Sequence, residues 1–290
     1  MAVTDARTGP TSPEGLYRYN LSPEELRALE VEMLYGISDR IVEGELPVAV
    51  VSGQSRFANI GRSVELQVGH IRTMPKTMEE YEANSEFLFV LDPRGAENGS
   101  PIVRHVLRIT RATQTFMDKG KTGLASVDDI VFNLGFAKYE DVLAKYGNGD
   151  QDSVPKFISI DSNATATPED PAHYFYTVAG YKAIEQYCVD NGIRFIFAEF
   201  NGSTTSSLIG AGVEFGPFMD NPNLELPNQD EINDGSPHTY KPYIIPVSQH
   251  NISLFQDPTF SDRPDVDIKH RDQAKFLAQM PVQMIYNTHL

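Results

Sequence analysis

Two acidic residues follow apolar segments in positions that suit proton transfer. Glu199 closes the apolar run Ile193–Glu199 (IRFIFAE), and Asp161 comes directly after the segment Lys156–Ile160 (KFISI). A carboxylate at the end of a buried strand can accept a proton from a substrate, so each is a candidate general base. The alternative for both is a solvated strand end or a partner for a nearby arginine.

Three arginines lie close together in the sequence at Arg104, Arg108 and Arg111. Because guanidinium groups bind carboxylates and phosphates, they are candidates for holding an anionic part of a substrate. The alternative is compensation for surrounding acidity, since the chain has 24 Lys+Arg against 40 Asp+Glu. Asn201 follows the strand that ends at Glu199; it is expected to cap the next helix, and a substrate contact is the alternative.

Alternating helix and strand signals must position these residues. Ser22 and Glu25 form a capping box and Pro23 suits the first helical position, which together predict the start of a helix. That helix is expected to stop near Gly44, before Pro47. Apolar residues recur at helical spacing over 171–191, and Gly192 is expected to end that helix. One of them, Cys188, is therefore expected in the core rather than as a nucleophile.

The strand signals predict a mixed sheet. Apolar runs at Phe87–Leu91 and Ile102–Ile109 enclose a loop rich in turn residues, which predicts a hairpin. A strand at 156–160, the helix at 171–191 and a strand at 193–199 predict a parallel pair, because such short crossovers join parallel neighbours. Less distinct signals complete the pattern: helices at 55–68 and 203–211, and strands at 213–218 and 243–247.

Four stretches of sequence, in this order, resemble the Gcn5-related N-acetyltransferase (GNAT) superfamily. They are similar to its branch of acyl-homoserine-lactone synthases and long-chain N-acyl amino acid synthases. The stretches are TMEEYEANSEFLFVLDPRG with VRHVLRIT, then IDSNATATP, YKAIEQYCVDNGIRFIFAEFN and NGSTTSSLIGAGVEF. The resemblance implies an α/β (α+β) fold with a mixed, partly parallel central sheet flanked by helices. It implies residues 1–45 as an N-terminal arm and helix, 46–250 as a GNAT-like acyltransferase domain, and 251–290 as a C-terminal extension.

The resemblance also implies an activity. The chain is expected to move an acyl group from a thioester to an amine by direct attack, without a tightly bound cofactor. Ser162 matches the family's serine, Asn163 stands where this branch prefers arginine, and Arg108 falls on the family's hairpin arginine. These three are therefore expected to contact the substrates. The alternative is a non-catalytic module that binds an acyl group or metabolite on a degenerate GNAT fold.

One departure from the family concerns the thioester donor. Acetyl-coenzyme A enzymes carry glycines before the central helix, whose N–H groups bind pyrophosphate. This chain has TATPEDPAHYFYTVAG there, with Glu169 and Asp170 at the expected phosphate position. Carboxylates occupy the same favourable site at a helix start that a phosphate would. We therefore expect an acyl group held on a carrier protein, with acyl-coenzyme A as the alternative donor.

Composition excludes other classes. The formal net charge of −16 argues against nucleic-acid partners, which require clustered positive charge. The single cysteine cannot form an internal disulfide, and no apolar run is long enough to span a bilayer, so a cytoplasmic location is expected. No metal site is expected, because the acidic C-terminal residues match no established ligand spacing. A metal enzyme using them is the remaining rival, and a homo-oligomer is left open.

Overall fold

The fold is described from a computed structural model of the chain. The structure describes residues 20–67, 80–128, 130, 134–147, 154, 156–167, 173–200, 205, 208–209, 212–226, 240–256 and 280–286. The predicted helix at 203–211 lies largely outside these ranges, as does Asn201. None of the helices within these ranges has the length and apolarity needed to cross a bilayer.

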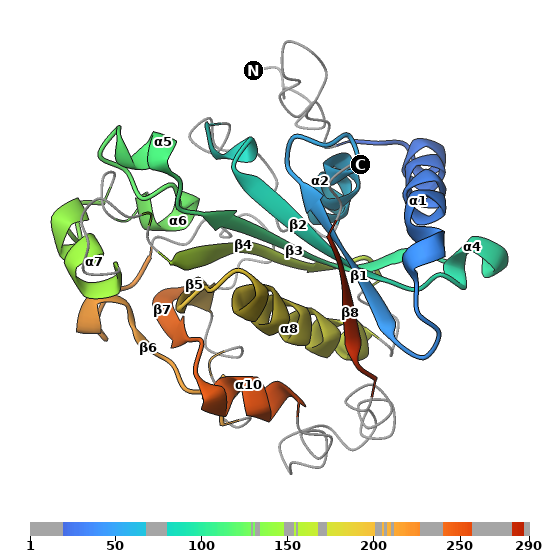
Figure 1. Cartoon of the computed structure of the whole chain (residues 1–290). Helices are drawn as coiled ribbons and strands as arrows, with labels where there is room; N and C mark the ends of the chain where they lie inside the picture. The colour runs from blue at the N-terminus through green and yellow to red at the C-terminus, as the bar shows by residue number, and fades with distance from the viewer. Residues whose placement is uncertain are drawn as a thin grey trace, which may run out of the picture. The chain divides into compact units, whose positions relative to one another are not determined.

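A mixed sheet forms the centre of the described fold (Figure 1). Its eight strands lie in the order β6-β7-β5-β4-β3-β2-β1-β8. Their bounds are β1 Leu46–Ser52, β2 Ser85–Leu91, β3 Val103–Arg111, β4 Phe157–Thr165, β5 Phe195–Phe200, β6 Gly216–Pro217, β7 Lys241–Pro246 and β8 Val282–Tyr286. The β4–β5 and β1–β8 pairs are parallel, whereas β1–β2, β5–β7 and β6–β7 are antiparallel. The predicted fold class, a mixed sheet flanked by helices, is confirmed.

Helices accompany this sheet. The longer ones are α1 Pro23–Ile37, α2 Ala58–Gln67, α7 Tyr139–Tyr146, α8 His173–Asp190 and α10 Gln249–Gln256. The short ones are η1 Ser38–Arg40, α4 Gly95–Asn98, α5 Gln114–Met117, α6 Ala125–Asp128 and η3 Phe218–Asp220. At the start of α1, Ser22 Oγ accepts a hydrogen bond from the Glu25 N–H, and the Glu25 carboxylate accepts one from the Ser22 N–H. The predicted capping box is confirmed, and Gly192, with φ +64°, follows the end of α8 as predicted.

The chain divides into two compact units, and β3, β4 and α8 contribute residues to both. The first unit comprises residues 1–109, 162–184 and 272–290; its core joins α1 and α2 to β1, β2 and β3. The second comprises residues 110–161 and 185–271; its core contains the aromatic residues Tyr146, Phe157, Phe197 and Phe218. The polar features described below are each contained in one unit.

Two strands of the first unit were not predicted. β1 pairs with β2 on one side and with β8, near the C-terminus, on the other. Thus residues 282–286, expected in a C-terminal extension, form an edge strand of the sheet. The division into residues 1–45, 46–250 and 251–290 stays a prediction. The predicted strand over 213–218 was too long: its regular part is Gly216–Pro217, because the chain turns into η3 at Phe218.

Candidate functional site

Asp161 and Glu199 occupy equivalent positions on neighbouring parallel strands. β4 and β5 pair from Phe157 with Phe195 as far as Ile160 with Ala198. Asp161 and Glu199 are the next residue on each strand, one step beyond the last pair, although both strands continue. Residues in equal register on parallel strands lie on the same face of the sheet. The two carboxylates predicted as candidate bases therefore both follow the last paired residues, on the same side of their strands, within the second unit.

Two hydroxyl groups fix the position of the Asp161 carboxylate. Ser159 Oγ donates a hydrogen bond to Asp161 Oδ1 at 2.7 Å, and Ser126 Oγ of α6 donates to the same oxygen at 3.4 Å. Ser159 is fully buried, whereas Asp161 and Glu199 are half-buried. The pair of carboxylates thus lies between the protein interior and solvent, where a proton can pass to water.

Side chains beyond Asp161 alternate between the two faces of β4. Asn163 Nδ2 donates to the Tyr181 hydroxyl of α8 at 3.2 Å. Two residues on, Thr165 Oγ1 lies 3.0 Å from His105 Nδ1 of β3 and 3.4 Å from Thr177 Oγ1 of α8. Ser162, which lies between Asp161 and Asn163, is buried on the opposite face, beside Glu65 of α2. In the first unit, Asn163 and Thr165 therefore present polar atoms to the long helix α8.

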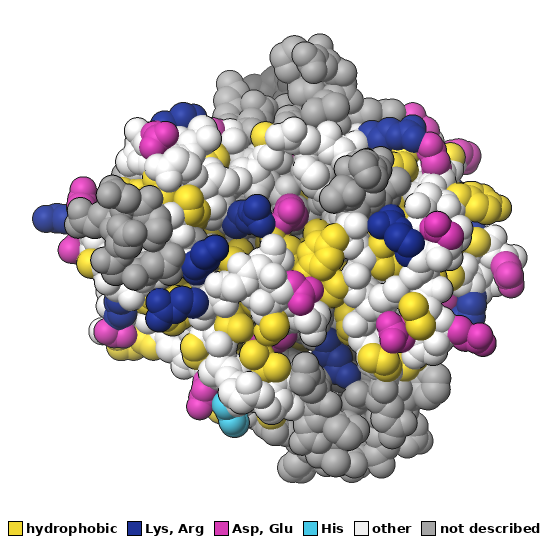
Figure 2. All heavy atoms as spheres, viewed as in Figure 1, with side chains coloured by type: hydrophobic (Ala, Val, Ile, Leu, Met, Phe, Trp, Pro, Cys, Tyr) yellow, Lys and Arg dark blue, Asp and Glu magenta, His cyan; other side chains and the backbone are white. Residues whose placement is uncertain are grey.

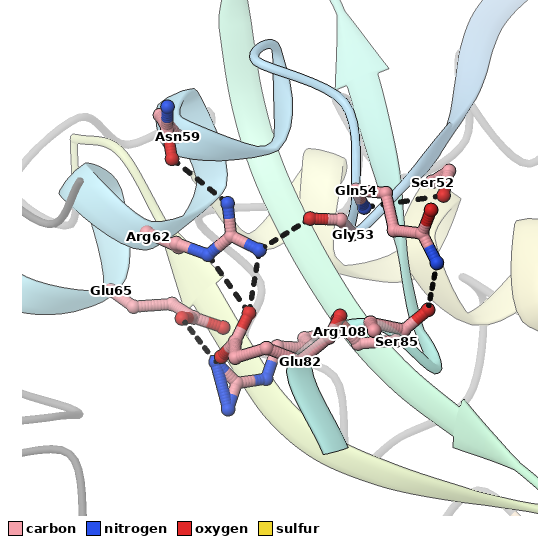
Figure 3. A network of polar contacts seen from close by, with 10 residues as sticks. Ser52, Gly53, Gln54, Asn59, Arg62, Glu65, Glu82, Ser85 and Arg108 are labelled. Carbon is pink, nitrogen blue, oxygen red and sulfur yellow. Dashed lines mark hydrogen bonds and ion pairs between the residues drawn. The ribbon is translucent and has the colours of Figure 1, made fainter. Parts of the chain in front are cut away.

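A buried network of charges is the most polar feature of the first unit (Figure 3). Arg62 of α2 donates from Nε to Glu82 Oε2 at 2.9 Å, from Nη1 to Asn59 Oδ1 at 2.8 Å and from Nη2 to the Gly53 carbonyl at 2.6 Å. Arg108 Nη1 of β3 lies 3.0 Å from Glu82 Oε1 and 3.3 Å from Glu65 Oε2. Two arginines thus balance two glutamates.

Glu65 is the titratable member of this network. Burial raises the pKa of its carboxyl to about 7, although Arg108 and the Ser162 hydroxyl act in the opposite direction. Neither Glu65 Oε1 nor Ser162 Oγ has a hydrogen-bond partner of ordinary geometry among the described residues. Ser162 was predicted to contact substrate; in the structure it is buried near Glu65, and the substrate contact stays a prediction.

The three arginines that were expected to hold an anionic part of a substrate lie in different surroundings. Arg104 is buried with its guanidinium 4.8 Å from the ring centre of Tyr176, and Arg108 is buried in the charge network. Only Arg111 is exposed, and its Nη1 donates to the Tyr187 hydroxyl at 3.4 Å. Every residue of β3 from Val103 to Thr110 is buried, and carboxylates of the same chain form ion pairs with Arg108. Arg108 is therefore already engaged by the carboxylates of its own chain.

Another buried carboxyl, outside this network, belongs to α8. Glu185 is 4% exposed, and burial raises the pKa of its carboxyl to about 7. One turn further on, Cys188 is fully buried, as predicted, and burial together with the charge of Glu185 raises the pKa of its thiol well above the ordinary value. Burial suppresses the thiolate, so Cys188 is unsuited to nucleophilic attack.

Sequence patterns did not single out Arg62, Glu65, Glu82 or Glu185. The sequence of α2 (ANIGRSVELQ) is polar and therefore gave little indication of burial. In the structure its residues from Ala58 to Glu65 are all buried. Within the described ranges no cluster of His, Cys, Asp and Glu could hold a metal ion. On the face shown in Figure 2, lysine and arginine side chains are interspersed with aspartate and glutamate, with hydrophobic atoms between them.

Comparison with known proteins gives structural similarities only. No protein-family model matches the chain, and no curated protein matches it in sequence. Among solved structures, it is similar to BjaI, a CoA-dependent acyl-homoserine lactone synthase with SAM and isopentyl-CoA, at 11% identity and a TM-score of 0.44, covering 84% of this chain and 93% of that one.

Two further solved structures are similar in part. The acyl-homoserine lactone synthase LasI matches at 13% identity with a TM-score of 0.38, covering 61% of this chain and 72% of that one. MesI, a CoA-dependent acyl-homoserine lactone synthase, matches at 12% identity with a TM-score of 0.36, covering 72% and 93% respectively. At such low similarity, functional inference must come from the side chains of this chain.

Proposed function

We propose that this protein is an N-acyltransferase that moves an acyl group from a thioester to an amine. The observation that carries the proposal is the end of the β4–β5 pairing, where Asp161 and Glu199 follow the last paired residues on two parallel strands. Amide formation from a thioester requires the reactants to be aligned, the amine to lose a proton and the carbonyl oxygen to be stabilised. The end of the paired region offers means for the first two.

Alignment comes from the strand backbones. Up to Ile160 and Ala198 the facing backbone groups of β4 and β5 are used in pairing with each other. One residue further on, this mutual pairing stops while both segments remain extended. Extended backbone that lacks its partner strand can hydrogen-bond an extended ligand. An acyl thioester with amide groups in its arm is a ligand of this kind.

Proton removal falls to Asp161 or Glu199. Asp161 is oriented by the Ser159 and Ser126 hydroxyls, which keep its carboxylate in a fixed direction. Glu199 is half-buried on the adjacent strand. Either can take the proton that the amine releases, directly or through one water molecule. The carboxylate that does not act as base favours binding of a cationic acceptor.

The amine attacks the thioester itself in this proposal. An acyl-enzyme on sulfur would need Cys188, the single cysteine of the chain. That thiol is buried in α8, and burial raises its pKa well above the usual range. The protein's sulfur is therefore not an acyl carrier. Because the segment before α8 has acidic residues where coenzyme A enzymes have glycines, we propose an acyl-carrier-protein thioester as the preferred donor.

The test is turnover by the purified full-length chain. Acyl-coenzyme A and acyl-carrier-protein thioesters of several chain lengths are each incubated with a panel of primary amines, and released thiol is followed with a chromogenic disulfide. Asp161→Asn and Glu199→Gln are compared with Glu140→Gln, which alters an exposed glutamate of α7. Loss of the base should lower kcat/KM by about 10²–10⁴-fold, whereas Glu140→Gln should match the wild type.

The result also separates the proposal from its rival. If no donor and amine pair releases thiol above the buffer rate, the enzyme proposal fails. Mass spectrometry of ligands retained on the native protein then tests the non-catalytic binding module. If thiol is released and both carboxylate variants keep wild-type rates, the activity stands but the assigned residues are wrong.

A further inference from the structure

Helix α8 and strand β4 are joined by a regular ladder of polar contacts. The Thr177 hydroxyl contacts the Thr165 hydroxyl. One helical turn later, the Tyr181 hydroxyl accepts a hydrogen bond from Asn163. Four helix residues advance about 6 Å, and two strand residues advance a similar distance. Thus α8 runs antiparallel to β4, and each turn of the helix matches two residues of the strand.

Thr177 and Tyr181 are four residues apart on α8, and Glu185 is the next residue at the same spacing. It follows Tyr181 by four positions, so it lies on the same face of the helix. Continuing the ladder by one step places Glu185 level with Asp161 along β4. Asp161 is the residue at which the pairing of β4 with β5 has just ended. The spacing therefore directs Glu185 toward the start of the proposed substrate site.

Glu185 differs from the other buried glutamates in having no cation beside it in the part of the chain that the structure describes. Glu65 and Glu82 are ion-paired with Arg108, and Glu30 lies 3.6 Å from Arg27. Glu185 is 4% exposed, and no described residue forms an ion pair with it or a hydrogen bond with its Oε2. Its charge instead raises the pKa of the neighbouring Cys188 thiol.

An unpaired buried carboxylate is costly, and proteins avoid it by keeping the group neutral or by supplying a cation. Burial raises the pKa of Glu185 to about 7, so without a ligand the group is partly protonated near neutral pH. A cationic ligand beside it would remove the cost of ionisation. A primary amine in its ammonium form is the cation that the proposed reaction itself brings to this site.

We propose that Glu185 binds the ammonium group of the acceptor amine and thereby selects amines over uncharged acceptors. This inference rests on the proposed function, and it adds to Asp161 and Glu199 a residue from a different element, α8. Glu185 positions the acceptor, while the base at the strand end removes the proton before the nitrogen attacks the thioester carbonyl. After the attack the C–S bond breaks, the nitrogen loses its second proton, and the leaving thiolate takes up that proton to become the free thiol.

Binding without turnover gives the direct test. Thermal unfolding of the full chain is measured with butylamine, hexylamine and benzylamine hydrochlorides, and with the matched alcohols as neutral probes. Glu185→Gln removes the charge and keeps the shape, and Asp190→Asn, an exposed position at the end of the same helix, is the matched control. At least one amine should stabilise the wild type and Asp190→Asn, and its apparent Kd should be at least about tenfold weaker for Glu185→Gln.

The outcomes distinguish this inference from the enzyme proposal. If Glu185→Gln binds the amines as tightly as the wild type, or if the alcohols bind as well as the amines, the assignment of Glu185 is overturned. It is also overturned if no amine stabilises the wild type. In the turnover assay, Glu185→Gln should raise KM for the amine and leave KM for the acyl donor unchanged. A uniform loss of kcat with unchanged KM would point to a structural role and contradict the inference.

Discussion

Replacing Glu65 by glutamine should change how stability depends on pH. The carboxyl is fully buried, and burial raises its pKa from an ordinary value of 4.5 to about 7. A carboxyl whose pKa is higher in the folded chain binds its proton more tightly there than in the unfolded chain. The folded state is therefore most favoured below pH 4.5, and it loses this advantage as the pH rises from 4.5 to about 7.

The size of the effect follows from these two pKa values. At about 1.36 kcal/mol per pKa unit, the wild type should lose about 3 kcal/mol of unfolding free energy across this window because of Glu65. Glutamine cannot ionise, so the Glu65→Gln variant lacks this loss. The unfolding free energy of the variant minus that of the wild type should rise by about 3 kcal/mol between pH ~4.5 and pH ~7.5, whatever its value at the acidic end.

Urea unfolding of both proteins, followed by circular dichroism at a series of pH values, measures this difference. Other titrating groups are common to both proteins and cancel. Glu97→Gln, an exposed position in α4, is the control, and its difference from the wild type should stay within about 0.5 kcal/mol at every pH. If the Glu65→Gln difference is equally flat, Glu65 does not have a pKa raised by burial, and the account of the network is refuted.

Three further substitutions test the packing around these sites. Glu82→Gln should destabilise the chain by about 3–5 kcal/mol in urea unfolding, because it leaves buried arginines without their shared partner; a loss below about 1 kcal/mol would contradict the network. Gly180→Ala should lower the thermal midpoint, because the new methyl carbon would lie 2.6 Å from His105 Cδ2 and overpacking costs about 1–3 kcal/mol. Alanine ordinarily stabilises a helix by about 0.5–1 kcal/mol relative to glycine. A raised thermal midpoint would therefore show that the His105 ring moves to make room for the methyl group. Ser22→Ala should cost about 1 kcal/mol in urea unfolding through the lost α1 cap, and an unchanged free energy would mean that the capping box adds nothing.

Local signals predicted the elements whose structure is decided locally. The Ser22 capping box, the helix ended by Gly192 and the hairpin strands were all visible in short windows of sequence. The parallel β4–β5 pair followed from the short crossover between them. The predicted parallel pair also placed Asp161 and Glu199 on adjacent strands. Residues at the carboxyl ends of parallel strands lie at the same edge of a sheet.

Non-local pairing explains what was not predicted. β1 contains Pro47, which is unusual in a strand interior, and no neighbouring segment completes it. Its parallel partner β8 is short and lies near the other end of the chain, where Leu46 pairs with Val282. A five-residue strand of this kind carries little signal of its own. Only the completed sheet identifies both strands.

Buried charge was also beyond the sequence patterns, for a related reason. Polar residues on a helix ordinarily indicate a solvated face, so Arg62 and Glu65 gave no sign of burial. Their burial depends on Glu82 and Arg108, which come from other elements and are distant in sequence. The same dependence explains why Arg108 was expected to hold a substrate anion. The sequence shows a cation, and the structure shows the carboxylates that already surround it.

The distribution of partners among the buried charges separates scaffold from candidate site. Arg62, Arg108, Glu65 and Glu82 neutralise one another, so a charged ligand would have to break existing ion pairs to bind there. Glu185 is also buried and has no such partner among the described residues. A ligand cation gains most beside a buried carboxyl that has no ion-pair partner, because it stabilises the ionised form and no existing ion pair has to break. On this argument a ligand cation is expected at α8, and the network around Arg62 is expected to hold the sheet and α2 together.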